Sequence, residues 1–225
     1  MPAVFITGTG TDVGKTFVAT GLIRCLRNLG QRVNALKPVA SGFDPAAPSG
    51  SDPALLLEAL GRDVNAAELQ RISPWRFRAP VSPDMAAYAE GKAIDFAEVI
   101  DFCSSAIAHN TGALLIEGVG GVMVPLDTQH TVLDVMVALQ LPVILVAGSY
   151  VGTLSHTLCS QDVILRQALD LRAIVVSETV NAGVSLEATL SSLANFTRAA
   201  LFGLRRQDGD AQNAAVFQQL AKIIA

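Results

Sequence analysis

The chain alternates short apolar runs with longer stretches in which apolar residues recur at helical spacing. Continuous apolar runs rich in β-branched residues are typical of strands buried on both faces of a parallel sheet. The predicted strands are Ala3–Thr7, Arg32–Lys37, Ala113–Glu117, Pro142–Ala147 and Leu171–Ser177. The predicted helices are Thr16–Leu29, Phe96–His109, Val132–Leu139, Ser155–Leu169 and Leu186–Phe196.

This strand-helix alternation predicts a mostly parallel sheet with helices on both faces. A chain of 225 residues can bury one substantial core, so we expect a single doubly wound α/β domain over residues 1–225. Apolar types make up 51% and charged types 16%, which is a low charged fraction for a globular protein. A buried sheet accounts for part of this low charged fraction, and a buried subunit interface could account for more of it.

The first predicted strand runs into a glycine-rich segment, residues 8–16, that ends in Gly14-Lys15-Thr16. Backbone N–H groups of such a loop, followed by a helix N-terminus, can surround a phosphate chain. Lys15 would then reach the outer phosphates and Thr16 would bind Mg²⁺. An ordinary helix start with a glycine turn is the alternative, but strand, loop and helix together favour a P-loop. Gly8 lies one position earlier than the common pattern places it.

Charge and cysteine content narrow the possible partners. The net charge is −4 without a dense basic cluster, which argues against nucleic acid and anionic membranes as partners. No signal-peptide pattern is apparent, and the longest apolar run, near 141–147, is too short to span a bilayer. Cys25, Cys103 and Cys159 lack metal-ligand spacing, so we expect reduced thiols in a cytoplasmic protein.

Polar and glycine residues follow each predicted strand, where the ligands of an open parallel sheet bind. Lys37 either ends a strand at the surface or faces phosphate. Asp52 precedes Pro53, and its spacing favours a helix N-cap. Glu117, between an apolar strand and a glycine-rich turn, favours Mg²⁺ binding over a turn role. We expect His156 to hydrogen-bond locally, and His109 and His130 to be surface or turn residues. The irregular segments 42–51 and 73–84 are expected to lie near the site.

Several motifs together resemble the dethiobiotin synthetase family. They are Gly8-Thr9 to Gly14-Lys15-Thr16, Lys37-Pro38-Val39-Ala40-Ser41-Gly42, Ser51-Asp52, Pro80 with Ser82-Pro83, Glu117-Gly118-Val119-Gly120-Gly121, Pro125-Leu126, and Pro142 to Val146 leading into Gly152 and His156. They follow one another in order over roughly the first three quarters of the chain, and the early glycine is itself the family's form of the loop.

The resemblance implies an ATP-dependent cyclo-ligase of biotin biosynthesis. Such enzymes convert 7,8-diaminopelargonate (7,8-diaminononanoate), CO₂ and ATP into dethiobiotin, ADP and phosphate, through a carbamate and a carbamoyl-phosphate mixed anhydride. It also implies a cytoplasmic homodimer that requires Mg²⁺.

The resemblance assigns roles to individual residues. Lys37 and Lys15 would be catalytic, and Thr16, Asp52 and Glu117 would bind Mg²⁺, which reverses the cap interpretation of Asp52. The nucleotide-binding set would be Asp12, Val13, Gly14, Lys15, Thr16, Phe17, Asp52, Glu117, Gly118, Val119, Gly120, Ser177 and Glu178. The substrate-binding set would be Thr11, Ser41, Ser82, Ser155 and His156, the last two receiving the substrate carboxylate from the neighbouring subunit.

The chain departs from the family pattern at four places. Asp12 replaces a common Glu, and Ser155 replaces an Asn. Ser177-Glu178 stands where an Asn-Asp pair would read adenine, and Leu204-Arg205-Arg206 replaces a proline-containing loop. We therefore expect ATP as the phosphoryl donor, while the sequence does not predict whether the site selects adenine over other bases.

Two other enzyme classes share parts of this pattern. A partitioning or regulatory ATPase usually has a second lysine early in its loop, and residues 8–13 contain none. A small-molecule kinase with a hydroxyl acceptor would more often need a base beside the alcohol, and no Asp-His pairing is apparent. A non-enzymatic binding module is disfavoured by Lys15, Thr16 and Glu117, which equip a Mg²⁺-nucleotide site.

Overall fold

The computed structural model describes residues 2–180, 183–206 and 210–224. Its main sheet has six parallel strands in the order β2-β5-β1-β6-β7-β8. The strands are β1 (Ala3–Gly8), β2 (Val33–Leu36), β5 (Ala113–Glu117), β6 (Val143–Gly148), β7 (Leu171–Ser177) and β8 (Ala200–Leu204). A second sheet pairs β3 (Val39–Ala40) with β4 (Trp75–Arg76).

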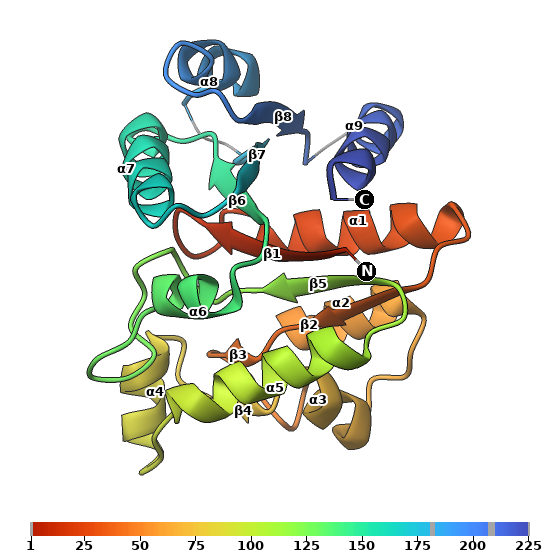
Figure 1. The fold of residues 1–225 in the computed structure, drawn as a ribbon, viewed down its shortest axis with the longest axis vertical. Coiled ribbons are helices and arrows are strands. Elements are labelled where there is room, and N and C mark those ends of the chain that lie inside the picture. Colours follow the sequence, from red (N-terminus) through yellow and green to blue (C-terminus); the bar gives the residue numbers. More distant parts are fainter. Residues whose placement is uncertain (1, 181–182, 207–209, 225) are drawn as a thin grey trace.

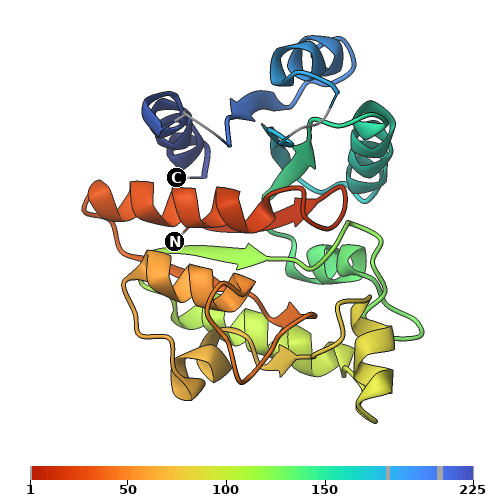
Figure 2. The same cartoon turned by 180° about the vertical axis from the view of Figure 1, so that it is seen from behind.

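Helices cover both faces of the main sheet. Helices α5 and α6 lie in front of the strands in Figure 1, and the reverse view in Figure 2 brings α1 and α2 to the front, while α7 and α9 flank the β6–β8 part of the sheet on opposite sides. The helices are α1 (Lys15–Asn28), α2 (Asp52–Leu60), α3 (Ala66–Ile72), α4 (Pro83–Ala89), α5 (Phe96–His109), α6 (Val132–Leu139), α7 (Thr153–Arg166), α8 (Leu186–Leu193) and α9 (Asp210–Ile224). The predicted doubly wound α/β fold is confirmed.

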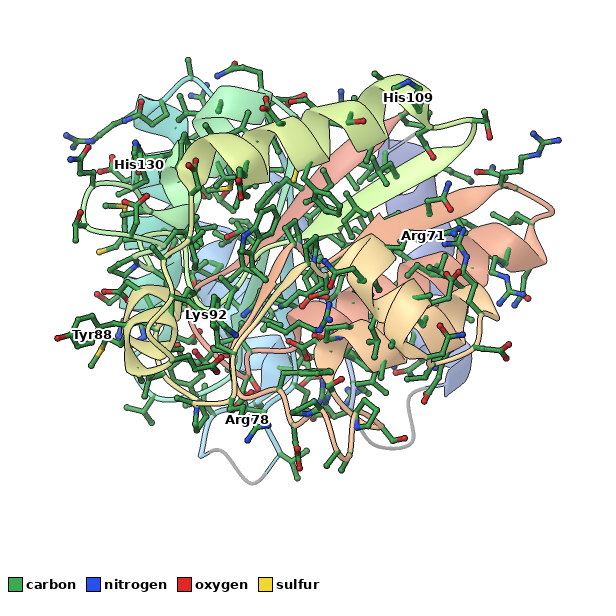
Figure 3. All side chains as sticks on the ribbon, turned by 90° about the horizontal axis from the view of Figure 1, so that it is seen from below. Arg71, Arg78, Tyr88, Lys92, His109 and His130 are labelled. Atoms are coloured by element: carbon green, nitrogen blue, oxygen red, sulfur yellow. The ribbon has the colours of Figure 1, made fainter. Side chains whose placement is uncertain are left out.

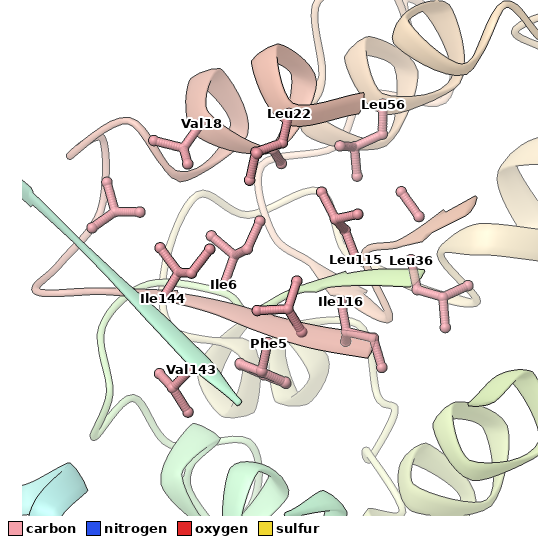
Figure 4. Close-up of a cluster of buried hydrophobic side chains, with 14 of the residues drawn as sticks. Phe5, Ile6, Val18, Leu22, Leu36, Leu56, Leu115, Ile116, Val143 and Ile144 are labelled. Carbon is pink, nitrogen blue, oxygen red and sulfur yellow. The ribbon is translucent and has the colours of Figure 1, made fainter. Parts of the chain in front are cut away.

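Alternating side chains of the central strands pack against opposite helical layers. Figure 4 shows Ile6 directed to the side of Val18 and Leu22 in α1, whereas the preceding Phe5 points the other way. Both β1 side chains are buried, with 0% and 2% exposure. The period of two along a strand therefore supplies two cores from one sheet, which explains why these strands read as continuous apolar runs.

The five predicted strands and five predicted helices are all present, with ends shifted by a few residues at most of them. The sequence interpretation missed β8, the two-residue strands β3 and β4, and the short helices α3 and α4. The last two lie in or beside the irregular segments that sequence placed near the site.

Strand register places two charged residues next to each other at the carboxyl edge of the sheet. Leu36 of β2 lies opposite Ile116 of β5. Lys37 and Glu117 are the next residues along each strand, so the parallel pairing brings them together although they are 80 positions apart. The carboxyl edge of the sheet is thus where the charged side chains gather.

Candidate active site

The loop between β1 and α1 has the backbone of an anion-binding turn. Asp12 and Gly14 have positive φ values of 57° and 102°. A Cβ on Gly14 would lie 2.6 Å from Oγ of Ser177, so both conformation and space require glycine there. The loop is tied to the turn after β5, because N–H of Val122 donates to the Gly8 carbonyl at 3.1 Å.

Lys15 lies over this loop and donates from Nζ to the carbonyl of Gly10 at 2.7 Å. Its side chain is largely buried, and only 6% of the residue is exposed. Burial, with a further contribution from the nearby positive charge of Lys37, lowers the pKa of Lys15 to about 8, although Glu117, Asp52 and Asp12 oppose the change. Two ammonium groups therefore lie close enough to repel one another.

Three oxygen-bearing side chains meet at the start of α1. Oγ1 of Thr16 lies 2.7 Å from Oδ1 of Asp52 and 2.8 Å from Oε1 of Glu117. A hydroxyl has one proton, so it can donate to only one of these carboxylates at a time. The other oxygen of Glu117, Oε2, is buried without a hydrogen-bond partner among the residues that the structure describes.

These oxygens fit a magnesium ion. Hydroxyl and carboxylate oxygens are the hard ligands that Mg²⁺ takes from proteins, and a buried carboxylate oxygen without a partner is costly unless something satisfies it. The geometry at Thr16, with one hydroxyl between two carboxylates, supplies three such oxygens. Residues 2–180, 183–206 and 210–224 contain no group of three or more His, Cys, Asp or Glu side chains that could hold a metal ion.

Lys37 forms the centre of a buried charge network. Its Nζ donates to Oε1 of Glu117 at 2.6 Å and to the Gly118 carbonyl at 2.8 Å, and it lies 3.0 Å from Oδ2 of Asp52. Only 1% of the Lys37 side chain is exposed. Burial alone would lower the pKa of Lys37, but Glu117 and Asp52 outweigh burial and raise it. Lys37 therefore stays protonated and does not end a strand at the surface.

Asp52 is not the N-cap that spacing favoured. Ser51 caps α2, since its Oγ accepts a hydrogen bond from N–H of Ala54 at 3.4 Å. The Asp52 carboxylate instead turns toward Thr16 and Lys37. Burial would raise the pKa of Asp52, but Lys37 and the Thr16 hydroxyl lower it below its ordinary value. The carboxylate is therefore charged and available to a cation.

A cavity of about 940 Å³ joins the loop to the Lys37 network. Twelve residues of the predicted site line it: Thr11, Asp12, Gly14, Lys15, Thr16, Phe17, Lys37, Ser41, Asp52, Ser82, Val119 and Gly120. Segments 42–51 and 73–84 each contribute to its wall, as expected. Glu117 contacts the cavity through Thr16 and Lys37 rather than lining it.

Six further predicted site residues, besides Glu117, lie outside this lining: Val13, Gly118, Ser155, His156, Ser177 and Glu178. Ser155 and His156 are exposed in the first turn of α7. His156 accepts or donates through Nδ1 at 2.9 Å from the Tyr150 hydroxyl, which confirms the expected local hydrogen bond. Ser177 is buried behind Gly14, with 2% exposure.

The cavity also contains Thr20, Arg24 and Phe43, which the sequence did not assign to the site, and Arg206, which the sequence noted only as part of a departure from the family pattern. Arg206 follows β8, so it belongs to one more strand end of the same sheet. Prediction of β8 as a strand would have singled it out.

The other two histidines lie away from the cavity. Figure 3 shows His109 and His130 at the periphery of the molecule. His109 ends α5, and the His130 ring stacks on Phe96 with centroids 4.0 Å apart. Their expected surface or turn positions are confirmed.

A parallel sheet with Gly-Lys-Thr between its first strand and first helix defines a P-loop NTPase domain. The family model described as AAA domain matches residues 2–207. Two solved structures share the fold at low identity. The cell division ATPase MinD of Pyrococcus furiosus has a TM-score of 0.57 and 15% identity, covering 100% of this chain and 98% of that one. A ParA family ATPase from Chlorobium tepidum has a TM-score of 0.54 and 14% identity, with coverages of 99% and 95%.

Curated relatives narrow the class. ATP-dependent dethiobiotin synthetases BioD of Caulobacter vibrioides and Acidiphilium cryptum are 48% and 46% identical to this chain. The alignments cover 87% and 86% of this chain and 88% and 87% of theirs. That of Legionella pneumophila is 38% identical over 84% of this chain and 90% of its own. The chain belongs to the dethiobiotin synthetase family, which confirms at family level the predicted ATP-dependent ligase over the partitioning ATPase and the kinase.

Proposed function

We propose that the protein is an ATP-dependent dethiobiotin synthetase. It takes 7,8-diaminopelargonate, CO₂ and ATP, and releases dethiobiotin, ADP and phosphate. One observation carries the proposal beyond family membership: Lys37 and Lys15 meet at one cavity, beside an anion-binding loop. Two cations at one site suit a reaction in which two anions must approach each other.

The acceptor of the phosphoryl group is the carbamate formed from CO₂ and one amine of the substrate. Its oxygen is already anionic, so it needs no protein base; it needs relief from repulsion by the γ-phosphate. An oxygen of the carbamate forms a bond to phosphorus as the bond from phosphorus to ADP breaks. The second amine then attacks the carbonyl carbon of the mixed anhydride and expels phosphate. Lys15 and Lys37 supply positive charge and position the two anions in line.

Thr16, Asp52 and Glu117 would hold Mg²⁺. When bound, the ion neutralises charge on the β- and γ-phosphate oxygens. The orphan oxygen of Glu117 and the two carboxylates converging on one hydroxyl support this assignment. Lys37 pairs with the same two carboxylates, and, although burial opposes it, this pairing lowers the pKa of Asp52.

The substrate would occupy the arm of the cavity beyond Lys37. Thr11, Ser41 and Ser82 provide hydroxyl groups there, while Pro80 and Val81 supply an apolar wall. That mixture suits a diamine with a hydrocarbon chain: polar groups orient its reactive end and the wall covers methylene groups.

The far carboxylate of the substrate would be received by Ser155 and His156 of a second subunit. Both residues are exposed at the N-terminus of α7, a helix end that favours anions. Val151 and Leu154 beside them expose 81% and 36% of their surface, so an apolar contact surface surrounds the polar pair. We therefore propose a homodimer.

The thiols of Cys25, Cys103 and Cys159 are free, which supports a reducing compartment such as the cytoplasm. None of the helices in the described part of the chain has the length and apolar character needed to cross a membrane.

The proposal is tested by incubating the protein with diaminopelargonate, ¹³C-bicarbonate, ATP and Mg²⁺. We expect dethiobiotin with one ¹³C in the urea carbonyl, and one phosphate released per product. Reactions without diaminopelargonate provide the control. Phosphate release that is independent of the diamine, without any cyclic urea detected by mass spectrometry, would refute the proposal and favour an ATPase.

A further inference from the structure

Part of the cavity wall is formed by a guanidinium group that lies over an aromatic ring. The Arg206 guanidinium carbon lies over the Phe17 ring, 4.6 Å from its centroid, and both residues line the cavity. Phe17 belongs to the first turn of α1, two residues after Lys15. A Cβ built on Gly14 would lie 3.3 Å from Nη1 of Arg206. This pair therefore borders the phosphate-binding loop directly.

The position of the pair identifies the part of the nucleotide that it would meet. Lys37 and Ser41 lie on the acceptor side of the loop, where the transferred phosphoryl group must point if the proposed function holds. The nucleoside must then extend to the other side, toward Phe17 and Arg206. The inference rests on the proposed function in this respect, and its test separates the two.

Both members of the pair are held in place from behind. N–H of Arg206 donates to Oε2 of Glu178 at 3.0 Å. The preceding Arg205 is fixed through both backbone groups by the Asn213 side chain, at 3.0 and 2.7 Å. The Phe17 ring packs edge-on against Phe217 of α9, with centroids 6.3 Å apart. Arg206 is thus presented to the cavity by a fixed segment.

The same contacts engage the residues that could have read a base edge. The carboxylate of Glu178 accepts from the backbone of Arg206, and its own N–H donates to the Leu204 carbonyl at 2.8 Å. Ser177 is buried behind Gly14. This end of the sheet therefore offers a nucleobase the guanidinium of Arg206, which the Phe17 ring supports from its other side. Such surfaces stack with any base, because every base has a π-face.

We propose that Arg206 and Phe17 form the nucleobase wall of this site, and that the chain holds purine and pyrimidine nucleotides alike by stacking. Arg206 is then the residue that determines how nucleotides are selected, and Glu178 is a positioning residue that acts through it.

Calorimetric binding of ADP, GDP, CDP and tripolyphosphate to the full chain tests this assignment. We expect the three nucleotides to bind the unmodified protein within about tenfold of one another. Arg206→Ala should weaken all three by about 5- to 30-fold, the range of a partly desolvated cation–π contact. Tripolyphosphate, which has no base, should bind both proteins equally.

Arg205→Ala is the matched control, because it removes the same charge from the same segment. Its guanidinium pairs mainly with Glu187 and Gln212 and lies 3.9 Å from Glu178, so nucleotide affinity should fall much less than in Arg206→Ala. Arg166→Ala, which removes an exposed arginine paired with Asp162 on α7, should leave nucleotide affinity unchanged. Thermal unfolding of Arg206→Ala, Arg206→Gln and the unmodified protein checks for a folding defect. We expect the three midpoints to agree, since Arg206 is exposed. Three results would overturn the proposal. They are an ADP affinity of Arg206→Ala equal to that of the unmodified protein, a loss of tripolyphosphate affinity in Arg206→Ala equal to its loss of ADP affinity, and ADP binding to the unmodified protein more than about 100-fold tighter than GDP and CDP. Normal nucleotide binding without dethiobiotin formation would refute the function and leave this inference standing.

Discussion

Nζ of Lys37 lies 2.6 Å from Oε1 of Glu117, and 1% of each side chain is exposed. A pair so deeply buried is costly to form, because both charges leave water. It is retained here beside a cavity, with Asp52 as a second carboxylate at 3.0 Å. Lys37 is therefore a permanent cation held where phosphoryl transfer would occur.

Lys37→Met should abolish most turnover while leaving nucleotide binding largely intact. The ammonium acts on the acceptor and the transferring group, and loss of one such electrostatic contact costs about 100- to 1,000-fold in rate. Dethiobiotin formation and the calorimetric affinity for Mg-ADP are the two measurements. Lys92→Met is the control, because Lys92 is an exposed lysine paired with Glu90. Equal turnover in both variants would show that Lys37 has no part in the chemistry.

The Lys37–Glu117 pair should also show strong coupling in stability. Lys37→Met leaves the buried Glu117 carboxylate without a cation, at a cost of about 3 to 5 kcal/mol in the free energy of unfolding. Glu117→Leu should cost less, because Asp52 still pairs with Lys37. The double variant should lose about 2 kcal/mol less than the sum of the two. Urea unfolding of the four proteins measures this coupling.

The surface pair of Glu90 and Lys92, with a similar separation of 2.7 Å, is the matched control for that cycle. Its coupling should be much smaller than that of the buried pair, because solvent screens exposed charges. Additive losses at Lys37 and Glu117 would mean that water or another group already compensates each charge.

Adjacent residues at the start of α2 should separate a capping role from a metal role. Ser51→Ala should lower the free energy of unfolding by about 0.5 to 1 kcal/mol through loss of the cap, with little change in the Mg²⁺ requirement. Asp52→Asn should raise the Mg²⁺ concentration for half-maximal turnover by about tenfold or more. Mg²⁺ titrations of turnover and urea unfolding distinguish the two. The reverse pattern would restore Asp52 as the cap.

Nucleotide binding should take up a proton near pH 8.5. With a pKa of about 8, Lys15 is mostly neutral at this pH. Bound polyphosphate raises its pKa and restores the charge, so about 0.7 proton should enter per nucleotide. Calorimetry in two buffers of different ionisation enthalpy measures this uptake. It should vanish at pH 6.5, where Lys15 is charged in both states, and uptake that is the same at both pH values would contradict the assignment.

The sheet was predictable from sequence because its central strands are apolar on both faces. Strand β8 was not predicted, because the short apolar run Ala200–Leu204 could equally end a helix. In the structure it is a mostly half-buried strand. Strands β3 and β4 have two residues each and exist only through their pairing, which no local pattern encodes.

The site divides in the same way. The phosphate loop is contiguous, so residues 8–16 revealed it directly. The contact between Lys37 and Glu117 depends on β2 and β5 being neighbours in register, which hydrophobic periodicity does not state. The prediction from spacing that Asp52 caps the helix was wrong, because Ser51 and Asp52 can both act as an N-cap. The contacts of Asp52 with Thr16 and Lys37 leave the capping role to Ser51.

Helix α9 supports Phe17 and Arg205 through Phe217 and Asn213. Phe217 packs against Phe17 and fills the space beside Gly21, where an added Cβ would overlap the ring. Asn213 fixes the backbone of Arg205. Substitutions on the inner face of α9 would therefore alter nucleotide affinity from a distance, and engineering of nucleotide preference has an adjustable support outside the binding surface itself.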